Sequence, residues 1–391
     1  MESISANAQI RNFFVTHGLE EIYTHKVIKH IAVFLTAMAI KGFSAKMTDV
    51  EEISGQHRTT ASYFLSKSPW DEKPLKEIIK NQSFAHVAQL AEQTGAPIFA
   101  SIDDTVNPKT KPSSRALRPM GGTAFHHSHL LGKRVWGHQV QAVMVSCGKL
   151  ALNYDLQRYD KTVQTKIDYA QTTIGNLPIP ETKAYVLADS WYTCDKIIDA
   201  CAARGYHYIG AMKTNRIIYP LGIRISIADF AQHIELNDVD LVTVNSKQYY
   251  TYRYEGKLNG VDNAVVVLSW PKDAFKVAKA LKAFISTDTE LSTAKILEYY
   301  ACRWCIETFF AQTKDTLGFG KYQIRSVKGI ERLWLLMSLC HLLCSTGLFE
   351  TLPFGLGLRS LRYELIVDRI TFIYHSAQLN VPLAEVIDLC S

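Results

Sequence analysis

The spacing of hydrophobic residues along the chain changes near residue 95. Before that point apolar residues recur at helical spacing, as in Ile22–Lys41 and Leu75–Gln93, and this period predicts several short helices. After it, short apolar runs such as Pro97–Ile102 and Ala184–Ala188 are bounded by Gly or Asp, which is typical of buried strands. We therefore expect a helical domain over residues 1–95, followed by an α/β domain.

Residues 96–213 are expected to form the first part of a mixed α/β core. Further strands are predicted over Val135–Ser146, Leu150–Leu156 and Tyr206–Met212, with helices over Lys161–Ile174 and Cys194–Ala203. The order is therefore three strands, a helix, a strand, a helix and a strand. Such an order predicts a mixed sheet whose first three strands form a meander.

The pattern becomes β-rich over residues 214–281. Two runs with strand character, Leu241–Tyr254 and Ala264–Trp270, flank an Asn-Gly turn, which predicts a small antiparallel insertion. The remaining segment, 282–391, is expected to return to the main sheet, complete the core and end in helices.

The helix expected over Glu298–Lys314 carries four polar residues on one stripe. At 100° per residue, Tyr300, Arg303, Glu307 and Lys314 fall within about 60° of one another. The opposite side is apolar, as expected of a core face. A carboxylate beside two cations and a phenol suits a metal ion and a phosphate. The alternative is a solvated surface with an Arg303–Glu307 ion pair.

The composition leaves the biochemical class open. The chain has 391 residues, 47% of them hydrophobic, which is ordinary for a globular protein of two or three domains. Its net charge of +6 is compatible with nucleic-acid binding without requiring it. Eight cysteines are scattered along the chain, and its C-x-x-C pair has no second Cys or His pair at zinc spacing, so reduced core thiols are expected.

No membrane association is expected. The first residues, MESISANAQIRNFF, lack the basic segment and apolar run of a signal peptide. The most apolar stretch, Leu333–Phe349, has 17 residues and contains His341, which favours a buried helix over a membrane span. We therefore expect a cytoplasmic protein.

Three carboxylates mark positions where chemistry is expected. Asp104 follows the first predicted strand, Asp189 ends the strand Ala184–Ala188, and Glu307 lies on the late helix. A carboxylate at the end of an apolar strand is costly unless it is paired or bound to a metal. Three that converge suit Mg²⁺, and two such ions can drive a phosphoryl transfer. The alternative is that the aspartates only cap turns.

These residues carry a family resemblance. The pattern Y-x-x-R-x-x-x-E-x-x-x-x-x-x-K is met without gaps by Tyr300, Arg303, Glu307 and Lys314. It resembles the signature of bacterial insertion-sequence DDE transposases, the group around insertion-sequence families 4 and 701.

Two upstream motifs extend the resemblance. Asp103-Asp104-Thr105 resembles the first-Asp motif of that group, in which the Asp before Thr is usually the ligand, so Asp104 is preferred to Asp103. The motif LADSWY, which contains Asp189, resembles the second. The β-rich insertion before the glutamate is also similar to this group.

The resemblance implies a fold and a reaction. The fold is α/β, with an RNase H-like (retroviral-integrase-type) mixed sheet, flanking helices, an all-β insertion and an N-terminal helical domain that binds DNA or forms a packing layer. The reaction is cut-and-paste transposition: cleavage at the transposon ends and strand transfer into target DNA.

The resemblance also implies roles for the site residues. Two Mg²⁺ ions, with Mn²⁺ as a substitute, would be held by Asp104, Asp189 and Glu307. DNA phosphates would be bound by Tyr300, Arg303 and Lys314.

The implied partners are the inverted repeats at the transposon ends, target DNA and a second copy of the chain in the synaptic complex. The implied location is the bacterial cytoplasm, at the nucleoid when bound to DNA. Two alternatives differ in class. One is a catalytically inactive or domesticated DNA-binding derivative. The other is an unrelated metal-dependent phosphohydrolase, which would have a closed pocket in place of a basic groove.

Three further groups of residues have open roles. The histidines are poorly spaced for tetrahedral zinc and are expected to be loop residues near DNA or simply exposed: His126, His127, His129 and His138. A basic loop would either contact DNA or be solvated: Lys109, Lys111, Arg115 and Arg118. Two aromatic residues are candidates for stacking on a flipped base, with the core as the alternative: Trp270 and Phe284.

Overall fold

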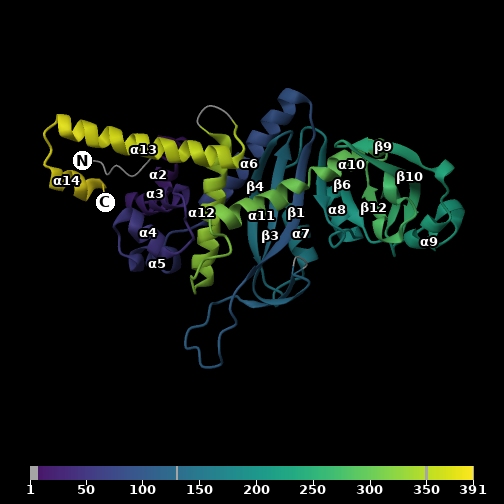
Figure 1. Cartoon of the computed structure of the whole chain (residues 1–391), viewed down its shortest axis with the longest axis horizontal. Helices are drawn as coiled ribbons and strands as arrows, with labels where there is room; N and C mark the ends of the chain where they lie inside the picture. The colour runs from purple at the N-terminus through teal and green to yellow at the C-terminus, as the bar shows by residue number, and fades with distance from the viewer. Residues whose placement is uncertain (1–7, 129–130, 348–350, 391) are drawn as a thin grey trace.

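The computed structural model describes residues 8–128, 131–347 and 351–390. Its elements lie along one long axis (Figure 1). The helices of residues 8–66 and the long helix α13 (Phe354–Gln378) occupy one end, the central sheet lies in the middle, and the insertion occupies the other end.

The N-terminal segment is helical, as predicted. Its helices are α1 (Ala8–Thr16), α2 (Leu19–Ile22), α3 (His25–Ala39), α4 (Met47–Ser54), α5 (Arg58–Ser66) and α6 (Lys73–Thr94). α6 begins with Pro74 in its first turn and ends at Gly95, whose φ of 67° suits a residue without a side chain.

The central sheet is mixed, as the order of elements predicts. β1 (Ile98–Pro108), β3 (Lys133–Cys147) and β4 (Leu150–Tyr159) form an antiparallel meander, and β2 (Ala124–Ser128) pairs with the first residues of β3. β5 (Ala184–Ala188) and β6 (His207–Met212) then run parallel on the other side of β1. The order across the sheet is β4-β3-β1-β5-β6. The crossover helices are α7 (Lys166–Gly175) and α8 (Asp195–Ala203).

β1 is longer than the sequence predicts. The apolar run ends at Ile102, but antiparallel pairing with β3 continues through Asp103 and Asp104 as far as Pro108. The partner strand satisfies the backbone hydrogen bonds of these polar residues, so the strand does not need apolar side chains to persist. Both aspartates therefore lie within the strand and point to opposite faces of the sheet.

The insertion continues the same sheet. β12 (Lys282–Ser286) pairs with β6 on one side and with β11 (Val261–Pro271) on the other. β11 in turn pairs with β10 (Lys247–Leu258) across a two-residue turn that includes Gly260 at φ 81°. The Asn-Gly turn and the return to the main sheet are therefore confirmed.

The β-rich run Leu241–Tyr254 forms two strands, β9 (Asp240–Val244) and β10, because Asn245 and Ser246 adopt positive φ and close a tight hairpin. One prediction for the insertion is wrong: it is not all-β, since it contains the helix α9 (Ile227–Gln232). Its remaining short strands are β7 (Ile217–Ile218) and β8 (Ile225–Ser226). The division into domains at residues 95, 213 and 281 stays a prediction.

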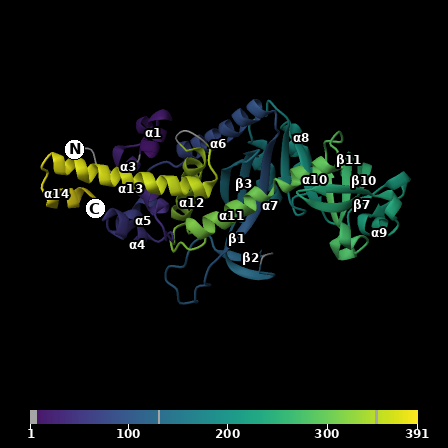
Figure 2. The same ribbon diagram turned by 45° about the horizontal axis from the view of Figure 1, so that its top comes forward.

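The helix expected over Glu298–Lys314 is divided into α10 (Thr293–Ala301) and α11 (Trp304–Thr316). At the junction, the backbone N–H of Arg303 donates to the carbonyl of Tyr300, three residues back, at 3.1 Å. The chain therefore tightens into a 3₁₀ turn but keeps helical dihedral angles. Both views show α10 and α11 following one another across the sheet (Figures 1 and 2).

The last helices are α12 (Val327–Thr346), α13 and α14 (Leu383–Cys390). α12 contains most of the apolar stretch Leu333–Phe349 and is largely buried against β4 and the N-terminal helices. Within the described ranges, no helix is both long and apolar enough to cross a membrane.

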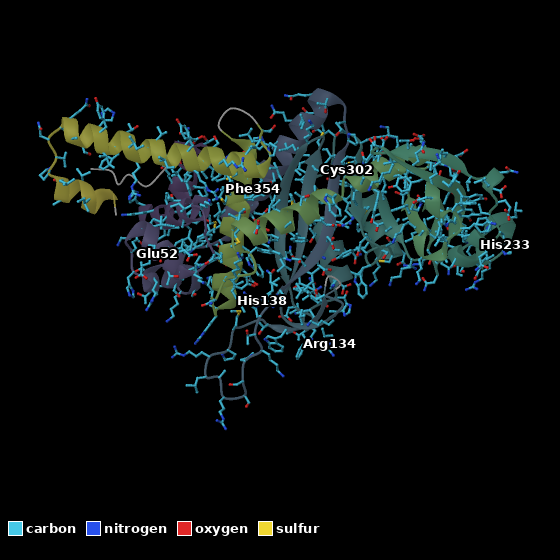
Figure 3. The ribbon with its side chains drawn as sticks, viewed as in Figure 1. Glu52, Arg134, His138, His233, Cys302 and Phe354 are labelled. Atoms are coloured by element: carbon cyan, nitrogen blue, oxygen red, sulfur yellow. The ribbon has the colours of Figure 1, made fainter. Side chains whose placement is uncertain are left out.

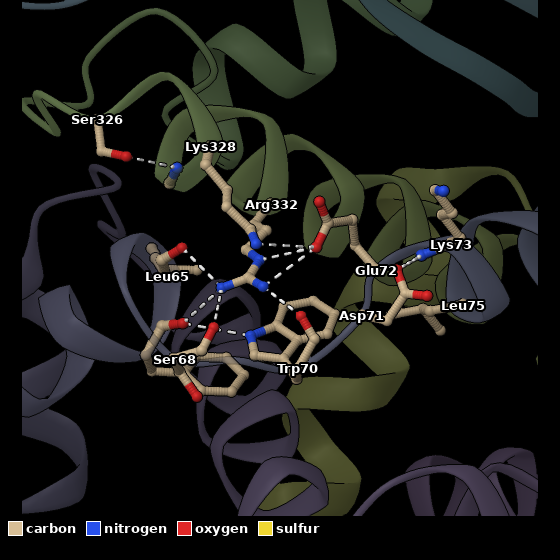
Figure 4. Close-up of polar contacts among 12 residues, drawn as sticks. Leu65, Ser68, Trp70, Asp71, Glu72, Lys73, Leu75, Ser326, Lys328 and Arg332 are labelled. Atoms are coloured by element: carbon tan, nitrogen blue, oxygen red, sulfur yellow. Dashed lines mark hydrogen bonds and ion pairs between the residues drawn. The ribbon is translucent and has the colours of Figure 1, made fainter.

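Arg332 on α12 joins the second half of the core to the N-terminal helices (Figure 4). Its side chain is 1% exposed, and its guanidinium lies 4.3 Å from the Trp70 ring and 3.1 Å from the Glu72 carboxylate. It also donates to backbone carbonyls that end α5 or follow it, those of Phe64, Leu65, Ser68 and Trp70. One buried guanidinium thus donates hydrogen bonds to four carbonyls at the end of α5 and in the segment that connects it to α6.

A second buried polar link closes the long loop after β1. His138 on β3 lies at the base of this loop (Figure 3). Its Nδ1 is 2.8 Å from the Tyr322 hydroxyl and its Nε2 is 2.8 Å from the Gly121 carbonyl. The neutral ring accepts from the tyrosine and donates to the carbonyl. Burial lowers the His138 pKa to about 4.

We predict that Arg332→Ala lowers the free energy of unfolding by about 3–5 kcal/mol, because it leaves buried carbonyls and Glu72 without their donor. Urea unfolding followed by circular dichroism measures this change. Lys328→Ala is the matched control, since Lys328 is 51% exposed and 4.0 Å from the same carboxylate, and it should change stability by less than about 0.5 kcal/mol. Equal losses in the two variants would contradict the role of Arg332.

We predict that His138 makes the protein less stable in acid. The folded state binds the proton with a pKa of about 4, below the ordinary value of 6.5, so the stabilisation is present above pH 6.5 and is lost as pH falls toward 4. Between pH 7 and pH 5 the wild type should lose about 1–2 kcal/mol more than His138→Gln, whose amide can make both bonds without titrating. Urea unfolding at the two pH values tests this, and identical losses would contradict it.

Candidate active site

Alternate residues of β1 contact the late helices. The three contacts are Ser101 Oγ with Cys305 Sγ at 3.7 Å, Asp103 Oδ2 with Arg303 Nη1 at 2.9 Å, and Thr105 Oγ1 with Lys314 Nζ at 2.6 Å. Because side chains alternate between the faces of a strand, these three residues share the face that α11 covers. Two residues of the polar stripe, Arg303 and Lys314, therefore contact β1.

Asp104 lies on the other face of β1. Its carboxylate accepts from Lys166 Nζ and from the Tyr192 hydroxyl, each at 2.9 Å, and also from the Gln139 amide. The structure thus brings Asp103, and not Asp104, to the face of the stripe. This placement conflicts with the preference for Asp104 from the sequence motif, because both residues lie inside one regular strand.

Asp189 lies beside Asp103. In the parallel pairing of β1 with β5, Ile102 is opposite Ala188, so the next residue of each strand, Asp103 and Asp189, extends on the same face. The Asp189 Oδ1 accepts the backbone N–H of Trp191 at 2.9 Å, which orients this carboxylate in its turn.

Arg303 links Asp103 to Glu307. One guanidinium nitrogen lies 2.9 Å from Asp103 Oδ2, and the other donates to Glu307 Oε1, one turn further along the helix. The side chains of Asp103, Arg303 and Glu307 are 21%, 13% and 34% exposed, so the cluster is half-buried but open to solvent. A single cation therefore holds two carboxylates from separate elements close together.

The electrostatics of this cluster are dominated by the carboxylates. Burial raises the Asp103 pKa to about 7; the Arg303 guanidinium opposes this rise, and the Asp189 charge adds to it. Asp103, Asp189 and Glu307 are three carboxylates beside one guanidinium, and such an excess of negative charge is the condition under which a further cation binds.

Tyr300 and Lys314 lie at the two ends of the stripe. The Tyr300 ring packs 4.7 Å from Phe284 and 5.6 Å from the Arg303 guanidinium, and burial raises its pKa. Lys314 lies over Phe310 at 5.8 Å, and burial lowers its pKa. Both polar groups thus belong to the face that carries Asp103.

The donors fit a hard cation in kind. Carboxylate oxygens are the ligands that Mg²⁺ and Mn²⁺ prefer, and Asp103, Asp189 and Glu307 supply them from three elements. The fit is one of donor type only: among the described residues, no group of three or more His, Cys, Asp or Glu lies close enough to hold a metal as the side chains are arranged here. Arg303 lies between two of the carboxylates and supplies positive charge there.

The other candidates have different surroundings. His126 and His138 are buried, and His129 lies outside the described residues. Lys109 is held by the carbonyls of Gly320 and Tyr322 at 2.9 and 2.7 Å.

Three basic residues of the long loop are exposed: Lys111, Arg115 and Arg118. Trp270 is 1% exposed and packs 5.4 Å from Phe275, so it is a core residue. Phe284 packs on Tyr300 at the edge of the site.

The sequence reading missed the residues around Asp104. Lys166, the first residue of α7, shows no local signal because it is one of many lysines. Gln139 and Gln141 do show one: they are two amides that alternate with apolar residues in a run expected to form a buried strand, and buried amides need partners. That signal could have indicated a polar network behind β1.

Comparisons with known proteins identify the family of this chain. The model of the family described as "Transposase DDE domain" matches residues 101–343, which include all three carboxylates. Together with the strand order, this match confirms the RNase H-like fold class. A search of curated proteins found no match.

Solved structures of transposases are also similar. The piggyBac transposase synaptic complex with hairpin DNA is 11% identical, with a TM-score of 0.45, over 100% of this chain and 83% of that chain. The Mos1 paired-end complex is 14% identical, with a TM-score of 0.18, over 42% of this chain and 53% of that chain. The Mos1 strand transfer complex is 12% identical, with the same TM-score, over 42% and 52%.

Proposed function

Because this chain belongs to the transposase DDE domain family, we propose that it cuts DNA at the ends of its own element and joins those ends to target DNA. The observation that carries this proposal is the position of Asp103, next to Asp189 in strand register and linked through Arg303 to Glu307. Three carboxylates from three elements then border one open, half-buried face.

We propose Asp103, Asp189 and Glu307 as the catalytic carboxylates. Asp104, favoured by its place before Thr105, is engaged with Lys166 and two further donors on the opposite face. A carboxylate on that face of β1 points away from Arg303 and Glu307, so it is a weak candidate for a ligand shared with the other two carboxylates.

The three carboxylates would hold Mg²⁺, or Mn²⁺ in its place, in the two-ion arrangement expected from the resemblance. When bound, such ions make a water or hydroxyl nucleophilic and stabilise the leaving oxygen of a phosphodiester. The protein's own residues then have to bind the DNA, orient it and keep the carboxylates in place.

The cationic residues of the stripe suit a phosphate backbone. The guanidinium of Arg303 can bind two phosphate oxygens at once, whereas the ammonium of Lys314 acts as a point charge. Tyr300 can donate its hydroxyl, since its raised pKa keeps it protonated at neutral pH. These contacts would position the cleaved end without reading its sequence.

The remaining partners follow from this role. The substrates would be double-stranded DNA carrying the terminal inverted repeats and then target DNA, and two copies of the chain would hold two ends in a synaptic complex. The reaction would take place in the bacterial cytoplasm, at the nucleoid. The N-terminal helices would contribute to DNA binding.

The alternatives find less support. A phosphohydrolase for small substrates needs an enclosed pocket around its catalytic groups, whereas two cavities, of about 910 and 370 Å³, are lined by residues of the insertion, α8 and adjoining strands and not by the three carboxylates. An inactive derivative has no need of the carboxylates and cations, yet the chain keeps all of them.

We predict that Asp103→Asn lowers the rate of Mg²⁺-dependent nicking by at least about 10³-fold, because it removes a carboxylate from the metal site. The assay uses linear DNA that carries the element's own ends. Asp104→Asn is the matched control and should retain activity within about tenfold, because its carboxylate faces the other side of β1. A reversal of the two effects would overturn the assignment, and absence of nicking by the wild type with tight binding of the ends would favour an inactive derivative.

We predict that Lys314→Ala weakens binding to duplex DNA and reduces the slope of log K against log salt by about 0.9, the value for one lost phosphate contact. Fluorescence anisotropy at several salt concentrations measures that slope. Lys321→Ala, an exposed lysine beyond the end of α11, provides the comparison. An unchanged slope for Lys314→Ala would count against Lys314 as a phosphate ligand.

A further inference from the structure

Trp191 is an exposed aromatic residue next to the candidate site. It lies two residues after Asp189, in the turn between β5 and α8, and its side chain is 50% exposed. Leaving so large an apolar ring in water forgoes the stabilisation that burial would give. A ring exposed in this position is therefore available to a ligand.

Two lysines from other elements surround this ring. Lys166 at the start of α7 and Lys213 just after β6 each place their Nζ 5.4 Å from its centroid. Both are within the distance at which a cation is attracted to an aromatic face. Lys213 is exposed, so its charge also reaches solvent.

The turn that carries the ring is hydrogen-bonded to both aspartate positions. The backbone N–H of Trp191 donates to Asp189 Oδ1 at 2.9 Å, and the hydroxyl of the next residue, Tyr192, donates to Asp104 Oδ2 at 2.9 Å. Asp104 also lies 2.9 Å from Lys166 Nζ. The backbone that presents the ring is therefore held in place at two points.

An exposed indole with neighbouring cations has the chemistry of a single-strand binding surface. The face of a base can stack on an indole only when that base is out of the double helix, and such stacking tolerates any base. A neighbouring lysine binds the phosphate of the same nucleotide, and this contact depends on salt.

We propose that Trp191, with Lys166 and Lys213, forms a platform on which an unpaired base of DNA stacks beside the candidate active site. The proposal rests on the proposed function in one respect, that the nucleotide belongs to the strand being processed. The platform consists of the exposed ring and two lysines, and the turn that carries the ring is hydrogen-bonded to Asp189 and Asp104. It lies outside the β-rich insertion.

The test compares single-stranded and duplex DNA without requiring cleavage. Fluorescence anisotropy in EDTA measures binding of a short oligothymidylate and of a duplex of the same length. Trp191→Ala should weaken binding of the oligothymidylate by about 5- to 100-fold and that of the duplex by less than about twofold. Trp191→Phe, which keeps an aromatic face, should restore most of the loss.

Two further variants make the outcome specific. Lys213→Ala should reduce the salt slope for the oligothymidylate by about 0.7. Tyr363→Ala, which removes a 70% exposed ring of α13, should change neither affinity. A thermal melt of each variant checks the fold, and if Trp191→Ala melts early, Trp191→Phe and Lys213→Ala carry the test.

The possible outcomes separate this inference from the proposed function. The platform is wrong if the wild type does not bind oligothymidylate, if Trp191→Ala binds it like the wild type, or if the variant loses duplex binding equally. Each of these results leaves the nicking assay free to succeed. Conversely, a protein that binds oligothymidylate through Trp191 but never nicks DNA would retain the platform and lose the proposed activity.

Discussion

The organisation of the site depends on one ion pair network, the guanidinium of Arg303 between Asp103 and Glu307. Two half-buried carboxylates, with Asp189 next to them, repel one another unless a cation lies between them. Arg303 supplies that cation from the junction of α10 and α11, where the 3₁₀ turn sets its position. The network therefore couples the late helices to the centre of the sheet and keeps the carboxylates close.

The architecture was largely predictable from the sequence. Helical spacing of apolar residues indicated the N-terminal helices, and short apolar runs indicated β5 and β6. The Asn-Gly pair indicated the β10–β11 hairpin. Each of these elements depends on local chemistry. The failures came where tertiary pairing overrides local signals. β3 extends β1 through polar residues, and the β-rich run Leu241–Tyr254 is divided by a turn at Asn245-Ser246 that the apolar pattern does not mark.

The site was predictable in its composition but not in its orientation. The spacing of the stripe predicts that Arg303 and Glu307 share one side of the late helices, and Arg303 does contact both Asp103 of β1 and Glu307. The motif favoured Asp104, but a shift of one residue along a strand exchanges the two faces, and a motif does not fix which face a residue occupies. That decision required the contacts of both faces: Arg303 on one and Lys166 on the other. On the other face of β1, Asp104 accepts a hydrogen bond from Tyr192, the residue that follows Trp191.

We propose that Asp103, and not Asp104, binds metal ions together with Asp189 and Glu307. Calorimetric titration of Mn²⁺ into the wild type, Asp103→Asn and Asp104→Asn tests it most directly. We expect Asp103→Asn to weaken Mn²⁺ binding by at least about tenfold, whereas Asp104→Asn should bind Mn²⁺ as tightly as the wild type. Normal binding by Asp103→Asn together with weakened binding by Asp104→Asn would contradict it.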